Sequence, residues 1–294
     1  MNEPRLVLNL RWQSSGAGPG SAFEQHGDLY SSDEGEEMTH TLAEAMSKAL
    51  LHRIHITGAS PRTGTTLIAE AMVACFEIDC FCAHEARIFA PPPHACQVFL
   101  TKSPRDILLA QAALEQTSEL HVIFMLRDPR DVIVSRHNRN PDRYWAGLKF
   151  WKAYTQAARP LLEHPRFITL RYEDLVSDPD ATQRALAKRL PFLEHRAAFS
   201  AFHQIAKPSS DSVTALGGVR QISNERVTNW RNHLPRVAGQ IALHGSIAED
   251  LIEFGYERDE QWLEEIAGVA PDLTPGHWPE YFTRDSIARL SKMP

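Results

Sequence analysis

One segment of the sequence combines the residue types that hold a phosphate group. Residues 58–66 read Gly-Ala-Ser-Pro-Arg-Thr-Gly-Thr-Thr and lie between a strand-like run and a run with helical spacing of apolar residues. Gly64 lets the backbone approach an anion closely, and free N–H groups at a helix start attract negative charge. Arg62 adds a cation, and Thr65 and Thr66 add hydroxyl donors. The alternative is a plain Gly/Pro turn.

A second segment, residues 126–137, carries an arginine and a hydroxyl that a helix would bring together. It reads LRDPRDVIVSRH and follows a continuous apolar run. Pro129 forces a turn after Arg127, and Asp131 is placed to cap a helix that brings Ser135 round beside Arg127. An arginine fork beside a hydroxyl suits a terminal phosphate. The alternative is a surface Arg/Asp cluster that only caps the helix.

These two segments are similar to those of the sulfotransferases that use 3′-phosphoadenosine 5′-phosphosulfate (PAPS). The family's phosphate loop reads Lys/Arg-Ser/Thr-Gly-Thr-Ser/Thr, which this sequence matches in order with Arg62, Thr63, Gly64, Thr65 and Thr66. The family's 3′-phosphate motif reads Arg-x-Pro-x-Asp-x-x-x-Ser, matched here by Arg127, Pro129, Asp131 and Ser135. The resemblance implies a P-loop-like α/β fold, PAPS as the cofactor, 3′-phosphoadenosine 5′-phosphate (PAP) as the product, and no metal.

Two further segments extend the resemblance over residues 53–256. Residues 171–179 resemble the family's Tyr-Glu-Asp-Leu segment, whose tyrosine, here Tyr172, lies beside the adenine; a tyrosine packed at a strand end is the alternative. Residues 228–234 resemble a Trp-Lys/Arg segment, but Ser223-Asn224-Glu225 stand where the family has Arg-Lys-Gly. Either Arg226 or Arg231 is available as the substitute cation.

The resemblance also implies which cations act in sulfuryl transfer. Such a displacement needs positive charge near the bridging and equatorial oxygens. Arg62 is placed to act on the leaving phosphate. Lys102, in the segment LTKSP, resembles a lysine of the bacterial and Golgi-type members and is expected to contact the sulfuryl oxygens.

Glu85 is the expected base for the acceptor, because several glycan- and tyrosine-modifying members present a glutamate after the first βα unit. The cytosolic branch places a histidine further along, where this sequence has Ser103 or Pro104. His84 and His94 compete with Glu85 as bases of ordinary pKa. The alternative to a catalytic role is that Glu85 is a solvated loop carboxylate.

Other chemistries stay open. Zinc would use thiolate and imidazole ligands among Cys80, Cys82, His84, His94 and Cys96, although these lack the usual Cys-x-x-Cys spacing. A nucleotide kinase would use Asp128 for magnesium, but Ala59 and Thr65 replace the glycine and lysine of its loop. The third possibility is a non-catalytic nucleotide-binding module.

The elements that must position these residues alternate between strands and helices. Strands are expected at the start of 53–60 and over 97–102, 120–126 and 166–170, with helices over 66–76 and 104–116 and a turn followed by a helix within 173–190. This order predicts a three-layer parallel α/β sheet with P-loop-NTPase-like topology. Residues 141–164 and 235–254 are each expected to form one helix, LAEAMSKALL a helix from Thr41, and RLVLNL a short edge strand.

The 294-residue length favours one large domain, with an acidic N-terminal arm over 1–40, a sulfotransferase domain over 41–256, and an acidic extension packed on it over 257–294. The net charge of −6 divides into −5 over residues 1–50, +6 over 51–248 and −7 over 249–294. This distribution argues against a general nucleic-acid binder and suits an anionic ligand.

We expect no membrane span, because no run of about 18 apolar residues occurs. A cytoplasmic location is expected because all four cysteines fall between positions 75 and 96, a poor disulfide framework. The acceptor would be a small molecule, glycan or peptide that presents a hydroxyl, in preference to an amine.

Overall fold

A five-stranded parallel sheet organises the residues described by this computed structural model, which are 51–137 and 140–277. The strand order is β2-β3-β1-β4-β7. The strands are β1 (His52–Gly58), β2 (Cys80–Phe81), β3 (Val98–Lys102), β4 (Leu120–Leu126) and β7 (Phe167–Arg171). The four predicted strands are therefore confirmed, and the two-residue edge strand β2 was not predicted.

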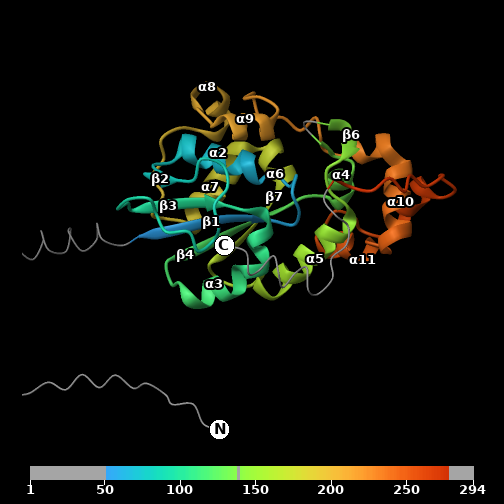
Figure 1. Ribbon diagram of the computed structural model, residues 1–294, viewed down its shortest axis with the longest axis horizontal. Coiled ribbons are helices and arrows are strands. Elements are labelled where there is room, and N and C mark those ends of the chain that lie inside the picture. The colour runs from blue at the N-terminus through green and yellow to red at the C-terminus, as the bar shows by residue number, and fades with distance from the viewer. Residues whose placement is uncertain (1–50, 138–139, 278–294) are drawn as a thin grey trace, which may run out of the picture. The chain divides into compact units, whose positions relative to one another are not determined.

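Helices cover both faces of this sheet, so the predicted three-layer α/β class is confirmed (Figure 1). Alternate residues of β4 point to opposite faces: Ile123 packs on one side, and Phe124 on the other. One face is covered by α2 (Thr65–Cys75), α6 (Tyr172–Ser177) and α7 (Pro179–Arg189), and the other by α3 (Ala110–Gln116) and α5 (Leu148–Ala158).

The remaining elements are short and lie mostly after the sheet in the chain. The helices are α4 (Pro129–Ile133), α8 (Phe202–Ile205), α9 (Ser210–Leu216), α10 (Leu234–His244) and α11 (Ala248–Glu253). A small antiparallel pair consists of β5 (Arg136–His137) and β6 (Asn140–Tyr144). The 3₁₀ helices are η1 (Pro104–Leu109), η2 (Arg159–Leu161), η3 (Phe199–Ala201), η4 (Asn229–His233) and η5 (Gln261–Ile266).

The prediction of one helix over 141–164 was wrong, because the region begins as strand β6 and becomes helical only at Leu148. Pro141 lies in the strand and Gly147 precedes the helix, and both residue types disfavour a continuous helix. Tertiary contacts hold the strand: the buried Tyr144 ring has the Arg136 and Arg236 guanidinium carbons 3.9 and 4.1 Å from its centroid.

The single helix predicted over 235–254 is also wrong, since α10 and α11 are separate helices. Gly245 ends α10 with φ +80°, a backbone conformation that side-chain-bearing residues rarely adopt.

The helix predicted over 104–116 begins as the 3₁₀ helix η1 and becomes α-helical at Ala110. The helix expected from Thr41 and the RLVLNL strand lie outside the described residues, and so does the whole of the predicted arm over 1–40. Within the described part of the chain, no helix is long and apolar enough to cross a membrane.

Candidate active site

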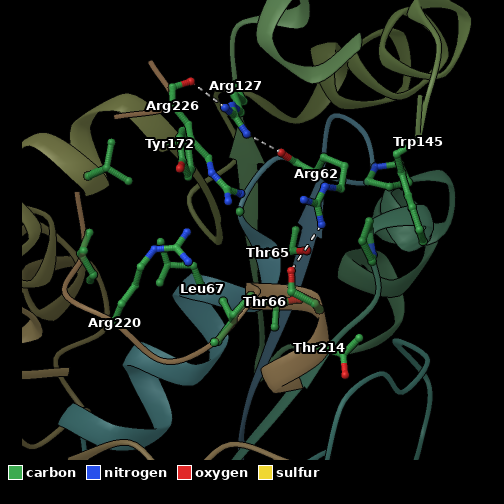
Figure 2. A pocket seen from close by; sticks show the side chains of 18 of the residues that line it. Arg62, Thr65, Thr66, Leu67, Arg127, Trp145, Tyr172, Thr214, Arg220 and Arg226 are labelled. Atoms are coloured by element: carbon green, nitrogen blue, oxygen red, sulfur yellow. Dashed lines mark hydrogen bonds between the residues drawn. The ribbon is translucent and has the colours of Figure 1, made fainter. Parts of the chain in front are cut away.

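A cavity of about 600 Å³ opens where β1, β3, β4 and β7 reach their carboxyl ends (Figure 2). Parallel sheets commonly bind ligands at this edge, because the loops that follow neighbouring strands meet there. The lining comes from the loop after β1 and the start of α2, the loop before β3, the segments that follow β4 and β7, and residues 202–226. His277 completes it from the far end of the described chain.

Two glycines allow the loop after β1 to fold tightly before α2. A Cβ atom on Gly58 would lie 2.4 Å from the Thr63 Oγ1 atom, and that hydroxyl donates to the Ser60 carbonyl at 2.8 Å. Gly64 has φ +92°, and a Cβ atom there would lie 2.7 Å from the Tyr172 ring. The loop therefore presents its backbone, with Tyr172 packed directly against it.

Three guanidinium groups meet beside this loop, as Figure 2 shows. Arg62 donates from Nε to the Ser135 hydroxyl at 2.8 Å, and its own backbone has φ +77°. Arg127 donates to the carbonyl oxygens of Arg62 and Arg226 at 3.0 and 2.9 Å. The Arg127 guanidinium carbon lies 4.2 Å from the Tyr172 ring centroid. Arg127 thus ties the loop after β1 to the segment that carries Arg226.

This arginine cluster has no carboxylate paired directly with it among the described residues. Burial, with Arg226 and Arg127 close by, lowers the pKa of Arg62 to about 10. Like charges gathered in a partly dry site repel one another, and a bound anion relieves that repulsion.

Asp128, and not Asp131 as predicted, caps α4: its carboxylate accepts from the Arg130 N–H at 2.8 Å. Asp128 takes the capping position because Pro129 starts the helix immediately after it. Asp131 instead accepts from the backbone N–H groups of Thr228 and Trp230 at 2.8 and 2.9 Å. Burial raises the pKa of Asp131 to about 6. Asp131 therefore anchors the segment that follows Arg226.

The structure distinguishes the two arginines that the sequence left open. Arg226 lines the cavity. Arg231 pairs with Glu265 at 2.9 Å, lies over the Trp230 ring, and is absent from the residues that line the described cavity. Arg226 is thus the cation available to a ligand, and the sequence could not have revealed this without the position of Glu265.

Lys102 and Glu85 meet beside the start of α2. The Lys102 ammonium donates to the Glu85 carboxylate and to the Thr66 hydroxyl, both at 3.2 Å. Lys102 is only 1% exposed, whereas the Glu85 side chain is 49% exposed. A buried ammonium thus joins the helix start to a carboxylate that is accessible from the cavity.

The two histidines that compete with Glu85 have different surroundings. His84 lines the cavity, and its Nδ1 lies 3.2 Å from the Ser212 hydroxyl. Burial lowers the pKa of His84, and the Lys102 ammonium lowers it further. His94 is exposed and contacts the carbonyl of its neighbour Ala95, away from the lining of the described cavity. Of these two histidines, His84 therefore shares the described cavity with Glu85, and His94 does not.

A buried network that sequence reasoning missed holds the loop on which Glu85 lies. Asp106 accepts from the Ile88 N–H at 2.7 Å and pairs with the Arg87 guanidinium at 2.8 Å. His55 lies fully buried on β1, with Nδ1 2.7 Å from the Thr101 hydroxyl and Nε2 3.6 Å from Asp106. Burial and the neighbouring cations lower the pKa of His55 to about 3.

His55 gives the fold a stability term that depends on pH. Its folded pKa is about 3 against 6.5 for an exposed histidine, so the unfolded chain binds the extra proton in this window. Stability is therefore lost as the pH falls below 6.5. Between pH 7 and pH 4, His55 should lower the free energy of unfolding of the wild-type chain by about 3 kcal/mol. We expect His55→Gln to lack this decrease. Urea unfolding of both proteins at the two pH values measures the difference, and parallel pH profiles would contradict the assignment.

The metal and kinase alternatives find little support at these positions. Within residues 51–137 and 140–277, no group of three or more His, Cys, Asp or Glu side chains is arranged to hold a metal ion. Asp128, the residue a kinase would use for magnesium, accepts from the Arg130 guanidinium at 2.7 Å in addition to capping α4. Its carboxylate is therefore already engaged in the fold.

Residues 83–192 match the model of a family described as "Sulfotransferase family". This part of the chain is similar to the sulfotransferase family. The matched segment includes Glu85, Lys102, Arg127, Ser135 and Tyr172, and it begins after the loop that follows β1. No curated protein matches the sequence.

Solved sulfotransferase structures resemble the chain at low identity. The sulfotransferase domain of the Synechococcus PCC 7002 olefin synthase is 15% identical with a TM-score of 0.42, over 62% of this chain and 88% of that one. The sulfotransferase domain of the curacin biosynthetic pathway is 14% identical with a TM-score of 0.38, over 76% and 99%. Sulfotransferase STF1 of Mycobacterium tuberculosis H37Rv is 12% identical with a TM-score of 0.34, over 63% and 76%.

Proposed function

We propose that this protein transfers the sulfuryl group of PAPS to a hydroxyl acceptor. The observation that carries the proposal is the cluster of Arg62, Arg127 and Arg226, which lies beside a glycine loop and a helix start without carboxylate partners among the described residues. A donor with phosphate groups at both its 3′ and 5′ positions supplies the negative charge that such a cluster lacks.

The proposed donor site divides between two groups of residues. Thr63, Gly64, Thr65 and Thr66, with Arg62, would hold the 5′-phosphosulfate end through backbone N–H groups and the guanidinium. Arg127 and Ser135 would hold the 3′-phosphate, with Tyr172 beside the adenine. The Nε atom of Arg127 is buried and has no hydrogen-bond partner among the described residues, so it is a donor available to a phosphate oxygen.

The proposed chemistry is a displacement at sulfur. The bond between sulfur and the 5′-phosphate oxygen breaks with its electrons moving to PAP, while the acceptor oxygen forms a new bond to sulfur. The acceptor proton passes to Glu85. Lys102 holds Glu85 in place and offers its charge to the sulfuryl oxygens, an arrangement that favours the bacterial or Golgi-type branch of the family. Because guanidinium and ammonium groups supply the charge, we expect no metal requirement.

Turnover of PAPS tests this function. The purified chain, incubated with PAPS and EDTA against a panel of hydroxyl and amine acceptors, is expected to release PAP and sulfated product in equal amounts. PAP release that depends on added Mg²⁺ would contradict the proposal. Binding of PAP without transfer to any acceptor would favour the non-catalytic nucleotide-binding module instead.

Glu85→Gln is expected to lower kcat by about 100-fold or more, because the general base is lost while the shape of the side chain is kept. PAP affinity should stay within about twofold, because glutamine preserves the contact with Lys102 and general acid–base roles do not contribute to product binding. Glu115→Gln, on the exposed side of α3, is the matched control. Steady-state kinetics of both variants and of His84→Asn measure the effect. A large loss in His84→Asn together with normal turnover in Glu85→Gln would move the base to His84.

The proposed acceptor is a small molecule, glycan or peptide. We also propose a cytoplasmic location, because a reducing compartment preserves free thiols such as the four cysteines of this chain.

A further inference from the structure

Three rings from two distant parts of the chain form one wall of the cavity. His137 stacks on Trp145 with centroids 4.6 Å apart, and the His277 ring lies 4.3 Å from His137 and 5.7 Å from Trp145. All three residues line the same cavity as the arginine cluster. We call these residues the ring wall.

The ring wall is joined directly to the proposed donor site. The Trp145 backbone N–H donates to the Ser135 carbonyl at 2.8 Å, and the Ser135 hydroxyl accepts from Arg62. Trp145 and Arg62 are both labelled in Figure 2. The ring wall also lines the same cavity as Glu85, the proposed base, so an acceptor that reaches Glu85 shares this cavity with the ring wall.

The last described residues, 271–277, hold His277 in this wall, and we call them the C-terminal strap. Asp272 donates from its backbone N–H to the Pro235 carbonyl at 2.8 Å, and its carboxylate accepts from the Tyr144 hydroxyl at 2.9 Å. The buried Arg236 guanidinium donates to the Thr274 carbonyl. The His277 N–H donates to the Tyr144 carbonyl at 2.7 Å. Backbone bonds at both ends therefore fix the strap.

A glycine in α10 makes room for the strap. A Cβ atom on Gly239 would lie 2.0 Å from the Asp272 carbonyl oxygen, so only glycine lets the two backbones approach this closely. Gly276 likewise packs on the backbone at Ala146, next to Trp145. The strap is thus fitted into the fold at the point where it delivers His277 to the cavity.

The ring wall also carries a polar group that the protein does not use. The indole Nε1 of Trp145 is buried and has no hydrogen-bond partner among the described residues. Buried indole N–H groups normally find a partner, so this one is available to an oxygen of a ligand. Stacked rings with one spare donor suit a flat aromatic ring that bears oxygen. A sugar would need partners for several hydroxyls at once.

We propose that the C-terminal strap and the ring wall select acceptors that carry a planar aromatic ring beside the accepting hydroxyl. The inference rests on the proposed sulfotransferase function, because that function places the acceptor next to Arg62. It assigns His277 and Trp145 as specificity-determining residues for the acceptor, and Asp272 as a positioning residue that acts through the strap.

Binding of 2-naphthol to the full chain saturated with PAP tests this inference by calorimetry. His277→Ala and Asp272→Ala are each expected to raise the Kd for 2-naphthol about tenfold, since each removes ring contact or its support. Trp145→Phe keeps a ring but loses the N–H donor, and should raise the Kd about fivefold. Leu273→Ala, an exposed residue on the strap, is the matched control and should leave the Kd within about twofold, as surface substitutions usually do.

Two further measurements keep the outcomes separate. The Kd for PAP should be unchanged in all variants. Tyr144→Phe removes only the hydroxyl from which Asp272 accepts, and it should raise the Kd for 2-naphthol as Asp272→Ala does. It replaces Asp272→Ala as the test if Asp272→Ala folds poorly. Unaltered 2-naphthol binding in all the wall and strap variants, no 2-naphthol binding to the wild type, or tighter binding of methyl glucoside would overturn the inference. Failure of the wild type to bind PAP would instead overturn the proposed function.

Discussion

Arg127→Ala is expected to weaken PAP binding about 100-fold or more, the largest effect on affinity that the site predicts. The buried Arg127 guanidinium is assigned to the 3′-phosphate, and it also bonds to the carbonyls of Arg62 and Arg226. Alanine would remove a desolvated cation and release the two segments that it ties together. Isothermal titration of PAP into both proteins measures the loss.

A second arginine provides the control for this substitution. Arg231→Ala removes the same charge from a residue that pairs with Glu265 outside the cavity lining, so PAP affinity should change by less than about twofold. Arg127→Lys should fall between wild type and alanine, because lysine keeps the charge but loses the fork. Equal affinities for wild type and Arg127→Ala would remove Arg127 from the donor site.

Lys102→Met is expected to lower kcat for sulfuryl transfer about 100- to 1,000-fold, with little change in PAP affinity. Its ammonium is buried between Thr66 and Glu85, where charge would develop on the sulfuryl oxygens during transfer. Methionine has a similar length without the charge, so the variant separates electrostatics from packing. Pre-steady-state formation of PAP measures the chemical step.

Lys188→Met, at the exposed end of α7, is the control for Lys102→Met and should keep wild-type kcat. Thermal unfolding of Lys102→Met checks that the loss does not come from a damaged fold. A kcat within threefold of wild type would show that Lys102 supports the structure alone.

The sheet and its main helices could be predicted because their signals are local. Leu120–Leu126 is apolar apart from His121, as a strand buried on both faces requires, and the residues after it carry Pro129 where α4 begins. The prediction over 141–164 failed because the helical spacing of its aromatic residues was weighed above Pro141 and Gly147. Both of those residues are local signals in the sequence.

Part of the site could not be predicted because it depends on contacts between distant residues. The roles of Arg226 and Arg231 differ only through Glu265, which lies 34 residues beyond Arg231. His55 and Thr101 are separated by 46 residues, and neither lies in a recognisable motif. The approach of His277 to Trp145 depends on Gly239 and on the Asp272–Tyr144 bond, whose partners are 128 residues apart.

Calorimetric titration of the full chain with PAP in the presence of EDTA, and separately with ATP and Mg²⁺, tests the central claim most directly. A site built from Arg62, Arg127 and Arg226 should bind PAP without metal and in preference to ATP. ATP bound more tightly than PAP, or PAP binding that requires Mg²⁺, would contradict it.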